Sequence, residues 1–363
     1  MLVLGIETSC DETAVALVES GHDVRANVVS SQIPKHAEYG GVIPELAARE
    51  HLRAMTPVVD MALEKAGASM DDVGGIAVTH TPGLLPALLV GLSYGKGLAA
   101  ARKIPFIGIN HIMAHVYGAF IEAESALRSL ETYPTLALIV SGGHSMLVLI
   151  DAKGKCQTLG QTLDDAAGEA FDKAARVIGL GYPGGPVMDR LAKRGDRKAH
   201  AFPRGLMGAG GTPLTPENRY NFSFSGVKTS LLHRVRELTP LPETLPESEL
   251  PQEWLDMIAS YQEAIVDALV RKSMWAVKAF GVRSLVLCGG VACNSRLREA
   301  LGEAANSANC RLHIAPPKYC TDNGAMIAGL AWHYLRRGVS HEYDLDAIPR
   351  MPPFTTVPFT PQG

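Results

Sequence analysis

Leu2-Val-Leu-Gly-Ile-Glu-Thr-Ser9 is a continuous apolar run that passes directly into small and polar residues. The same design recurs in Leu136-Ala-Leu-Ile-Val-Ser-Gly-Gly-His144 and in Leu285-Val-Leu-Cys-Gly-Gly-Val-Ala-Cys-Asn294. Apolar runs of this length are typical of strands buried on both faces, as in α/β proteins. Glycines at strand ends let backbone N–H groups approach phosphate oxygens, which α/β sheets bind beyond the carboxyl ends of their strands. The three stretches therefore predict an α/β fold with a phosphate-containing ligand.

The spacing of these stretches indicates a duplicated architecture. The first two lie about half of the globular core apart, which suggests two related lobes with a cleft between them. Between and after them the pattern predicts strands at 13–18, 75–79 and 105–109 and helices at 44–66, 91–102 and 254–280. Residues 200–256, rich in Gly and Pro, hold the acidic run 242–249 and are expected to form an exposed insertion. The tail after Arg337 shows no periodicity, and we expect it to be extended or mobile.

Composition limits the class of protein. The chain has 363 residues, enough for two domains, and a net charge of −3 that gives no global attraction to nucleic acid or anionic membranes. A polyanionic substrate must then meet a local basic patch or a partner. The six cysteines are scattered without CxxC spacing, which suits reduced cytosolic thiols. Without a basic secretory region or an apolar run near ~20 residues, we expect a cytoplasmic protein.

A histidine pair at helical spacing is the sharpest chemical signal. His111 and His115 lie at i and i+4, so one helix face presents both imidazoles to one cation, and Asn110 is a natural N-cap. A zinc protease carries a glutamate directly after the first histidine, where this chain has Ile112. The pair therefore favours a metal that orients or polarises a ligand. The alternative is two histidines that only satisfy neighbouring groups.

Asp322 is the candidate third ligand. It lies in a short polar turn before an apolar helix, within Tyr319-Cys-Thr-Asp-Asn-Gly-Ala-Met326. Two histidines and one carboxylate, with open positions left, suit zinc or ferrous iron. The alternative is that Asp322 or Thr321 caps the helix that follows.

Carboxylates crowd the turn after the first strand. Asp11 and Glu12, close to Glu7, are candidates for general-base catalysis or for holding a nucleotide-bound cation. Turn carboxylates are more often solvated or bonded to backbone, an interpretation that suits Glu12 better than Asp11.

Further polar groups follow the glycine turns. Ser141-Gly-Gly143 and Gly289-Gly290 are candidate phosphate and nucleoside contacts, and the carboxylates of Asp172 and Asp189 flank a glycine loop where they bind a ribose or are ordinary surface charges. Arg190-Leu-Ala-Lys-Arg-Gly-Asp-Arg-Lys198 is the densest basic stretch. It is either a contact for a phosphate backbone or a solvated helix face.

With these motifs placed, the chain closely resembles the tRNA N6-adenosine threonylcarbamoyltransferase family (TsaD type, formerly regarded as a glycoprotease). The resemblance covers residues 1 to about 335 and rests on ordered motifs: Gly5-Ile-Glu-Thr-Ser-Cys-Asp-Glu-Thr-Ala14, Gly41-Val-Ile-Pro-Glu-Leu-Ala47, Thr81-Pro-Gly-Leu-Leu85, His111-Ile-Met-Ala-His115, Val140-Ser-Gly-Gly-His144, Gly168-Glu-Ala-Phe-Asp-Lys173, Tyr182-Pro-Gly-Gly185, Phe222-Ser-Phe-Ser-Gly-Val-Lys228, Gly289-Gly-Val-Ala292 and Thr321-Asp-Asn323. Segment 200–256, outside 222–228, and the tail match the family poorly.

The resemblance implies a two-lobed α/β fold of the actin-like ATPase type, shared with sugar kinases and heat-shock chaperones, with a duplicated β-sheet core and a central cleft. We accordingly expect an N-terminal lobe at 1–132 that the helix 323–337 completes. A C-terminal lobe at 133–322 would carry the insertion 200–256, and an extended tail would follow at 338–363.

The implied reaction transfers a threonylcarbamoyl group from threonylcarbamoyl-adenylate to N6 of the adenosine beside the anticodon, position 37, in tRNAs reading ANN codons. By motif, His111, His115 and Asp322 would bind one metal ion per subunit, Fe²⁺ or alternatively Zn²⁺. The adenylate contacts would be Ile139, Val140, Ser141, Gly142, Gly143, Asp172, Gly185, Asp189 and Asn294. Implied partners are tRNA, a catalytically inactive paralogue subunit and a separate ATPase. Competing hypotheses are a small-molecule kinase of the same fold and, because of Ile112 less favoured, a metalloprotease.

Overall fold

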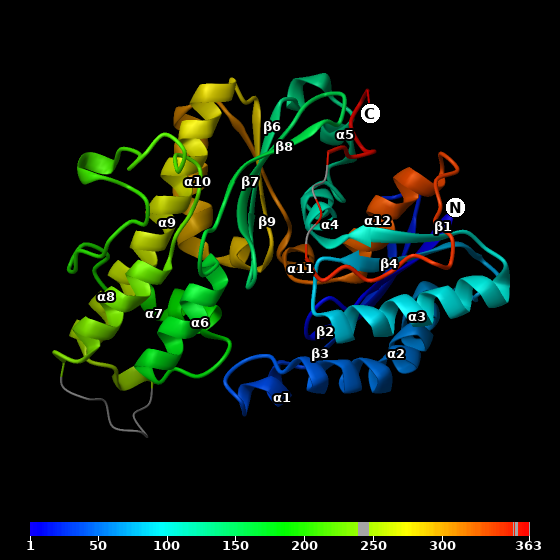
Figure 1. Cartoon of the computed structure of the whole chain (residues 1–363), viewed down its shortest axis with the longest axis horizontal. Coiled ribbons are helices and arrows are strands. Elements are labelled where there is room, and N and C mark those ends of the chain that lie inside the picture. Colours follow the sequence, from blue (N-terminus) through cyan, green and yellow to red (C-terminus); the bar gives the residue numbers. More distant parts are fainter. Residues whose placement is uncertain (239–246, 351, 353–354, 363) are drawn as a thin grey trace. The chain divides into compact units, whose positions relative to one another are not determined.

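The chain divides into two compact units. The computed structural model describes residues 1–238, 247–350, 352 and 355–362. The first unit comprises Met1–Glu131, Asp151–Cys156 and Ala315–Gly363, and the second comprises Thr132–Ile150 and Gln157–Ile314. Each unit is built around one five-stranded sheet, as Figure 1 shows.

The first sheet has the order β3-β2-β1-β4-β5. Its strands are β1 (Leu2–Glu7), β2 (Glu12–Glu19), β3 (Asp23–Ser31), β4 (Val73–Thr81) and β5 (Phe106–Asn110). β1, β2 and β3 pair antiparallel, whereas β4 and β5 run parallel to β1. The associated helices are α1 (Ile33–Ala37), α2 (Pro44–Ala66), α3 (Leu85–Arg102), α4 (His111–Gly118), α5 (Glu124–Leu127), α11 (Pro317–Cys320) and α12 (Gly324–Leu335).

The second sheet has the order β10-β9-β6-β7-β8. Its strands are β6 (Thr135–Val140), β7 (Ser145–Ile150), β8 (Cys156–Gln161), β9 (Ser284–Cys288) and β10 (Arg311–Ile314). β6 pairs antiparallel with β7 and parallel with β9, as β1 does with β2 and β4. Its helices are α6 (Ala167–Ile178), α7 (Gly184–Ala192), α8 (Ser225–Val235), α9 (Gln252–Phe280) and α10 (Ser295–Ser307). Counted along the chain, both sheets therefore have the strand order 3-2-1-4-5, which confirms the expected duplication.

The predicted helices are found, with one boundary that was wrong. α2 begins and ends where the sequence pattern placed it, and α9 begins two residues earlier than expected. α3 begins at Leu85, whereas the sequence pattern placed its start at Gly91. Proline lacks only an N–H that the first helical turn does not use, so Pro86 is tolerated there.

A glycine contact positions the helix that follows Asp322. α12 lies directly on β1, and a Cβ added to Gly5 would stand 2.5 Å from the backbone nitrogen of Ala328. On the helix side, a Cβ added to Gly324 would stand 2.4 Å from the nitrogen of Ala16. Because both positions lack side chains, the start of α12 and the turn before it approach the strands closely.

The C-terminal tail contacts the edge of the first sheet, and its described residues form neither helix nor long strand. His341 N–H donates to the Phe106 carbonyl (2.7 Å), and His341 Nδ1 accepts from Gly108 N–H (3.0 Å). Ile348 N–H donates to the His80 carbonyl at 2.8 Å. Residues 341–348 of the tail are thus extended, as predicted, and are bound along β4 and β5.

Segment 200–256 is partly packed on the second unit. Phe202, Phe222 and Phe224 are buried, and Lys272 of α9 donates to the carbonyls of Leu206 (3.5 Å) and Asn218 (3.4 Å). Residues 242–246 of the acidic run lie outside the described residues.

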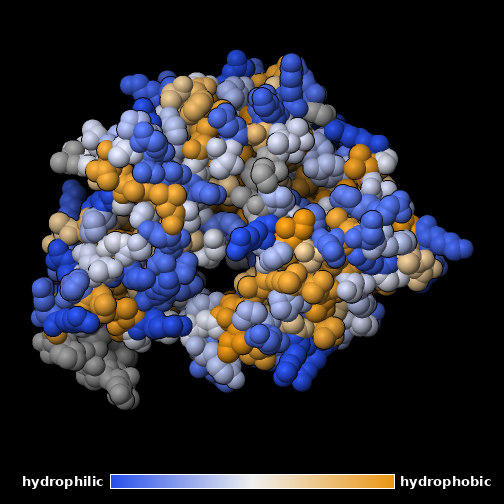
Figure 2. Space-filling view, viewed as in Figure 1, coloured by the Kyte–Doolittle hydropathy of each residue, from blue (hydrophilic) through white to orange (hydrophobic). Residues whose placement is uncertain are grey.

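Several large hydrophobic side chains on α2 and α3 are exposed. Leu52 is 68% exposed, and Leu85 and Leu89 are each more than 40% exposed. Figure 2 shows hydrophobic residues on this face of the first unit. Within the part of the chain that the structure describes, no helix is long and apolar enough to cross a membrane.

Candidate active site

The histidine pair stands at the start of α4, directly after β5. Asn110 Oδ1 accepts from the backbone N–H of Ile112 (2.9 Å) and Met113 (3.1 Å), which confirms the expected N-cap. His111 and His115 lie one turn apart, and their Nε2 atoms are 3.1 Å from each other. Both rings are buried, so they meet each other away from bulk water.

Asp322 completes a group of three converging ligand atoms. Its Oδ1 lies 3.5 Å from His111 Nε2 and 3.2 Å from His115 Nε2. Three ligands at ~2.1 Å from one tetrahedral ion would be separated by roughly 3.4 Å, close to these distances. The three side chains can therefore hold a metal ion.

The capping alternative for Asp322 is wrong. The cap of α12 is the next residue, Asn323, whose Oδ1 accepts from Met326 N–H at 3.0 Å. Thr321 lies before Asp322 in the same turn and does not cap the helix either. The carboxylate of Asp322 instead faces the two histidines.

Glu7 holds the other side of the His111 ring. Its Oε2 lies 2.9 Å from His111 Nδ1 and accepts from the Thr79 hydroxyl at 2.6 Å, and its Oε1 accepts from Ser9 N–H. Glu7 is fully buried. Carboxylates in this position orient metal-binding histidines. The sequence analysis named Glu7 without this role, although a carboxylate that ends a buried apolar strand was the signal for one.

Glu7 and His111 stabilise each other's charged form. Burial alone would raise the pKa of Glu7, but the charge and hydrogen bond of His111 outweigh it and hold this pKa below its usual value. Burial opposes the charge on His111, yet Glu7 and Asp322 raise its pKa to about 9. Burial and the neighbouring His111 lower the pKa of His115. His111 is thus the more strongly basic of the two rings.

Glu12 lies in surroundings that favour its protonated form. Burial, with the nearby charges of Asp322 and Asp11, raises the pKa of Glu12 to about 10. Glu12 therefore carries a proton at neutral pH, and its Oε1 accepts from the Ser31 hydroxyl at 3.1 Å. A protonated carboxyl group is a poor proton acceptor, so Asp11 is the better candidate for a base.

In the second unit, the Ser141–Gly143 turn closes on itself at the end of β6. Ser141 N–H donates to the His144 carbonyl (2.8 Å), and His144 N–H donates to Ser141 Oγ (3.1 Å). A Cβ added to Gly142 or Gly143 would meet nothing within 4 Å, so a ligand can approach this backbone. Ile139 and Val140 are fully buried in β6, which leaves only their backbone for a ligand.

Hydrogen bonds connect this turn with the other residues that were predicted to contact the adenylate. Gly168 N–H, at the start of α6, donates to the Ser141 carbonyl at 3.2 Å. Asp172 of α6 accepts from Gly184 N–H at 2.8 Å, which fixes the glycine turn that contains Gly185. Asp189 of α7 accepts from both the N–H (3.1 Å) and the hydroxyl (2.9 Å) of Ser295. The turn, α6, α7 and the start of α10 thus form one connected region.

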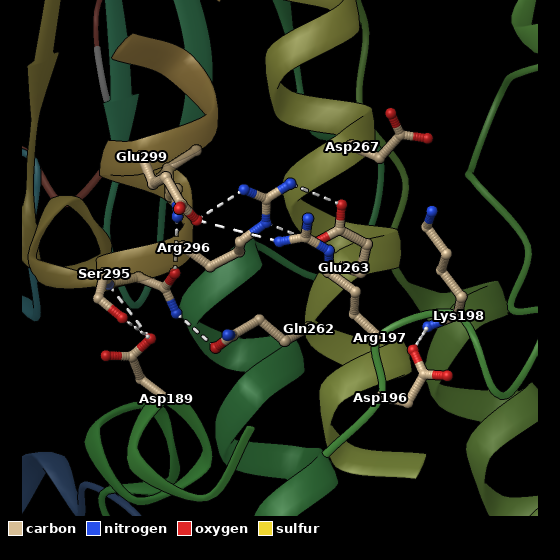
Figure 3. Close-up of polar contacts among 12 residues, drawn as sticks. Asp189, Asp196, Arg197, Lys198, Gln262, Glu263, Asp267, Ser295, Arg296 and Glu299 are labelled. Carbon is tan, nitrogen blue, oxygen red and sulfur yellow. Dashed lines mark hydrogen bonds and ion pairs between the residues drawn. The ribbon is translucent and has the colours of Figure 1, made fainter. Parts of the chain in front are cut away.

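A cavity of about 640 Å³ adjoins this region. The residues that line it include Gln262, Glu263 and Ser295, which Figure 3 shows. Asn294, next to Ser295, donates to Gln262 (2.7 Å) and also caps α10 by accepting from Leu297 N–H (2.9 Å). Arg296 makes a bidentate pair with Glu263 (2.7 and 2.9 Å). Charged side chains of both signs line the cavity, among them Arg197, Arg296 and Glu299.

Most of the basic stretch is engaged within the second unit. Arg190 pairs with Glu247 (2.5 Å), and Arg194 donates to the carbonyls of Glu247 (2.9 Å) and Ser248 (3.0 Å). Lys193 lies 3.7 Å from Asp189 and Arg197 lies 4.0 Å from Glu299. These contacts favour ordinary surface charges over an open phosphate-binding patch, although α7 ends at Ala192 and residues 193–198 do not form the expected helix face.

Comparison with known proteins gives consistent matches. The family model for TsaD, tRNA N6-adenosine threonylcarbamoyltransferase, matches residues 23–329. The chain is 49% identical over 352 residues to the tRNA N6-adenosine threonylcarbamoyltransferase of Geobacter sp. (strain M21), covering 97% of this chain and 96% of that protein. It is 50% identical over 347 residues to the enzyme of the same description from Geobacter sulfurreducens, covering 96% of each.

Solved structures share the fold at low identity. HypF from T. kodakarensis matches with a TM-score of 0.59 and 12% identity, covering 94% of this chain and 48% of that one. Component A of the (R)-2-hydroxyglutaryl-CoA dehydratase from Acidaminococcus fermentans matches with a TM-score of 0.50 and 15% identity, covering 92% and 98%. Together with the two equivalent sheets, these neighbours confirm the expected actin-like ATPase fold.

Proposed function

Because the chain belongs to the tRNA N6-adenosine threonylcarbamoyltransferase family and forms threonylcarbamoyladenosine in tRNA, we propose that its two units divide the parts of this reaction. The first unit would supply the metal-binding group and a base, and the second would bind the donor. The donor would be threonylcarbamoyl-adenylate, and the acceptor would be N6 of adenosine 37 in tRNAs that read ANN codons. The observation that carries the proposal is the convergence of His111, His115 and Asp322.

The donor set of the first unit fits a resident transition metal. Two imidazoles and one carboxylate with open positions suit Fe²⁺, which we propose as the ion, one per subunit, with Zn²⁺ as the alternative. When bound, the ion supplies Lewis-acid polarisation of an acyl oxygen of the donor. Glu7 keeps His111 oriented with Nε2 toward the other two ligands.

The second unit offers the features that an adenylate needs. The open backbone of Gly142 and Gly143 would receive the phosphate, because N–H groups there can approach it without a side chain between. Gly185 and the backbone of Ile139, Val140 and Ser141 would complete this contact, and the Asp172 carboxylate would accept hydrogen bonds from the ribose or the adenine. Asp189 and Asn294 stand beside the polar cavity, which would hold the nucleoside.

The chemistry that remains for the protein is proton transfer and placement. The mixed anhydride is already activated, so the exocyclic amine of adenosine needs correct orientation and loss of a proton. Asp11 is the proposed acceptor of that proton. Glu12, protonated at neutral pH, would donate a hydrogen bond instead.

The proposal also includes protein partners. The acidic net charge and the engaged basic stretch leave tRNA binding to be shared with other subunits, and we infer an inactive paralogue and a separate ATPase. The exposed Leu52, Leu85 and Leu89 on α2 and α3 support a protein partner for the first unit. With tRNA as its substrate, the enzyme would act in the cytoplasm.

A reconstitution tests the proposal. The metal-loaded chain is mixed with tRNA and threonylcarbamoyl-adenylate, with and without the candidate partner subunits, and modified nucleosides are measured by mass spectrometry. We expect multiple turnovers only with the partners, and loss of product for Asp322→Asn and for Asp11→Asn. Repeated turnover by the isolated chain would show that partners are not required. Full activity of Asp11→Asn would show that Asp11 is not the base.

A further inference from the structure

A chain of buried polar side chains links the exposed segment 33–43 to the Cys10–Asp11 turn. Its members are Gln32, His36 and His51, joined by Thr13, and none is more than 5% exposed. They belong to different elements: Thr13 lies on β2, His36 on α1 and His51 on α2. Buried polar groups that connect three elements carry specific geometry, because each must find its partner.

The hydrogen-bond directions at His51 follow from its acceptors. His51 Nε2 lies 3.0 Å from the Cys10 carbonyl, which can only accept, so Nε2 carries the proton. Burial lowers the pKa of His51, which keeps the ring neutral and makes Nδ1 an acceptor. Nδ1 receives the Thr13 hydroxyl (2.8 Å) and the Gln32 side-chain amide (3.3 Å).

The hydrogen-bond directions at His36, the other end of this chain of side chains, follow in the same way. Ile43 N–H donates to His36 Nδ1 (3.3 Å), so His36 Nε2 carries the proton and donates to Gln32 Oε1 (3.1 Å). The amide of Gln32 is therefore held from both sides, and its Nε2 also donates to the Ala47 carbonyl (3.3 Å). The chain has one consistent direction, from Ile43 N–H to the Cys10 carbonyl.

This chain ends on the backbone of the carboxylate turn. Cys10 carbonyl is held by His51 Nε2, and the carbonyl of Asp11 accepts from the backbone N–H of Gln32 at 3.0 Å. Two successive carbonyls are thus fixed by residues of one network. The backbone position of Asp11, and with it the origin of its side chain, depends on His51 and Gln32.

We propose that His51 is a positioning residue for the transfer reaction, which sets the Asp11 carboxylate through the Cys10 carbonyl. This rests on the proposed role of Asp11 as the base. Displacing a reacting group by ~1 Å costs on the order of 100-fold in rate. A role in folding alone would lower stability without changing the rate of the folded enzyme.

Two substitutions at His51 test its two ring nitrogens separately. The amide nitrogen of glutamine falls near the position of Nε2, so His51→Gln keeps the donor to Cys10 and loses the acceptor. The amide oxygen of asparagine falls near Nδ1, so His51→Asn keeps the acceptor for Thr13 and Gln32 and loses the donor to Cys10. Matched controls are His22→Gln and His22→Asn, because His22 is partly exposed in the same unit and contacts Ser20 and Glu124.

The measurements are the single-turnover rate at saturating donor and tRNA, the KM for the donor, and the metal affinity, in the complete assembly. We expect His51→Asn to lower the rate about 100-fold with unchanged KM and metal affinity, and His51→Gln to stay within several-fold of the native rate. Equal rates for the two variants would overturn the positioning role. If Asp11→Asn is fully active, the base assignment fails first and this inference falls with it; if Asp11→Asn is inactive but His51→Asn is not, only the inference fails.

A second variant covers the case in which His51→Asn does not fold. His36→Asn keeps the acceptor for Ile43 and removes the donor to Gln32, at the end of the chain away from Asp11. We expect a several-fold lower single-turnover rate with unchanged KM. A native rate for this variant would overturn the proposal.

Discussion

Glu7 Oε2 lies 2.9 Å from His111 Nδ1, on the side of the ring opposite to Asp322. The pair joins the last residue of β1 to the first residue of α4, and Thr79 of β4 donates to the same carboxylate oxygen. Three elements that are distant in the sequence thus meet at the Glu7 carboxylate. The consequence is that the orientation of a metal ligand depends on the first strand of the fold.

Replacing Glu7 by glutamine should weaken metal binding without removing a ligand. Groups that hydrogen-bond to a metal-binding histidine in this way contribute about 10- to 100-fold to metal affinity. We expect Glu7→Gln to lose a factor in this range, measured by competition of a chromophoric chelator for Co²⁺ or Zn²⁺. Glu50→Gln is the control, because Glu50 pairs with Lys35 of α1 and Arg53 of α2 and contacts neither histidine. Equal affinities for the two variants would show that the Glu7 bond does not tune the site.

His111, His115 and Asp322 should bind a single ion jointly. Removing the buried imidazole in His115→Ala leaves two ligands, and we expect stoichiometric metal to be lost on gel filtration. Elemental analysis of the native chain and the variant measures this directly. A variant that keeps one full equivalent of metal would contradict a shared site.

Gly142→Val should abolish donor binding while the fold and metal content stay native. The added Cβ meets no protein atom within 4 Å, so the substitution fills only the space that a phosphate would enter. Calorimetric titration with a non-hydrolysable adenylate analogue measures the effect. Gly302→Val in α10 is the matched control, since its Cβ also meets nothing within 4 Å. Donor binding that survives Gly142→Val would place the phosphate elsewhere.

His333 should make the fold sensitive to acid. Burial, with the charges of Arg336 and Arg337, lowers its pKa to about 3. The unfolded chain, with an ordinary pKa of about 6.5, binds the proton first as the pH falls, so stability decreases below that pH until about pH 3. In His333→Leu this contribution is absent, and Tyr117 keeps its bond to the Gly21 carbonyl (2.8 Å).

Between pH 6.5 and 5, the native chain should lose about 1.5 kcal/mol more than His333→Leu. Urea unfolding at both pH values measures this difference, and His233→Leu, at an exposed position of the second unit, is the control. Parallel pH profiles for the native chain and His333→Leu would mean that His333 is not responsible.

Features that depend on periodicity could be predicted from the sequence. Features that depend on contacts between residues distant in the sequence could not. Helical spacing was sufficient for His111 and His115, and apolar runs were sufficient for the sheets. Whether Asp322 faces a ligand or caps a helix depends on backbone geometry, which the neighbouring Asn323 decides by capping α12. The protonation of Glu12 likewise arises from burial and from Asp322, which approaches it only in the folded chain.

One missed residue was readable in the sequence. His51 shares the buried face of α2 with Met55, Val58 and Ala62, at helical spacing. A histidine on an apolar stripe indicates a buried polar group that needs partners. What the pattern does not contain is the identity of those partners, Thr13, Gln32 and the Cys10 carbonyl, because they come from other elements.

The contact of His341 with β5 limits sheet pairing between copies of this chain. β5 is the outer strand of its sheet, and an uncovered outer strand is a template for pairing with a strand of another molecule. His341 occupies the Phe106 carbonyl and the Gly108 N–H on that border. These two backbone groups of β5 are thus not open to a strand of another copy, because His341 already occupies them.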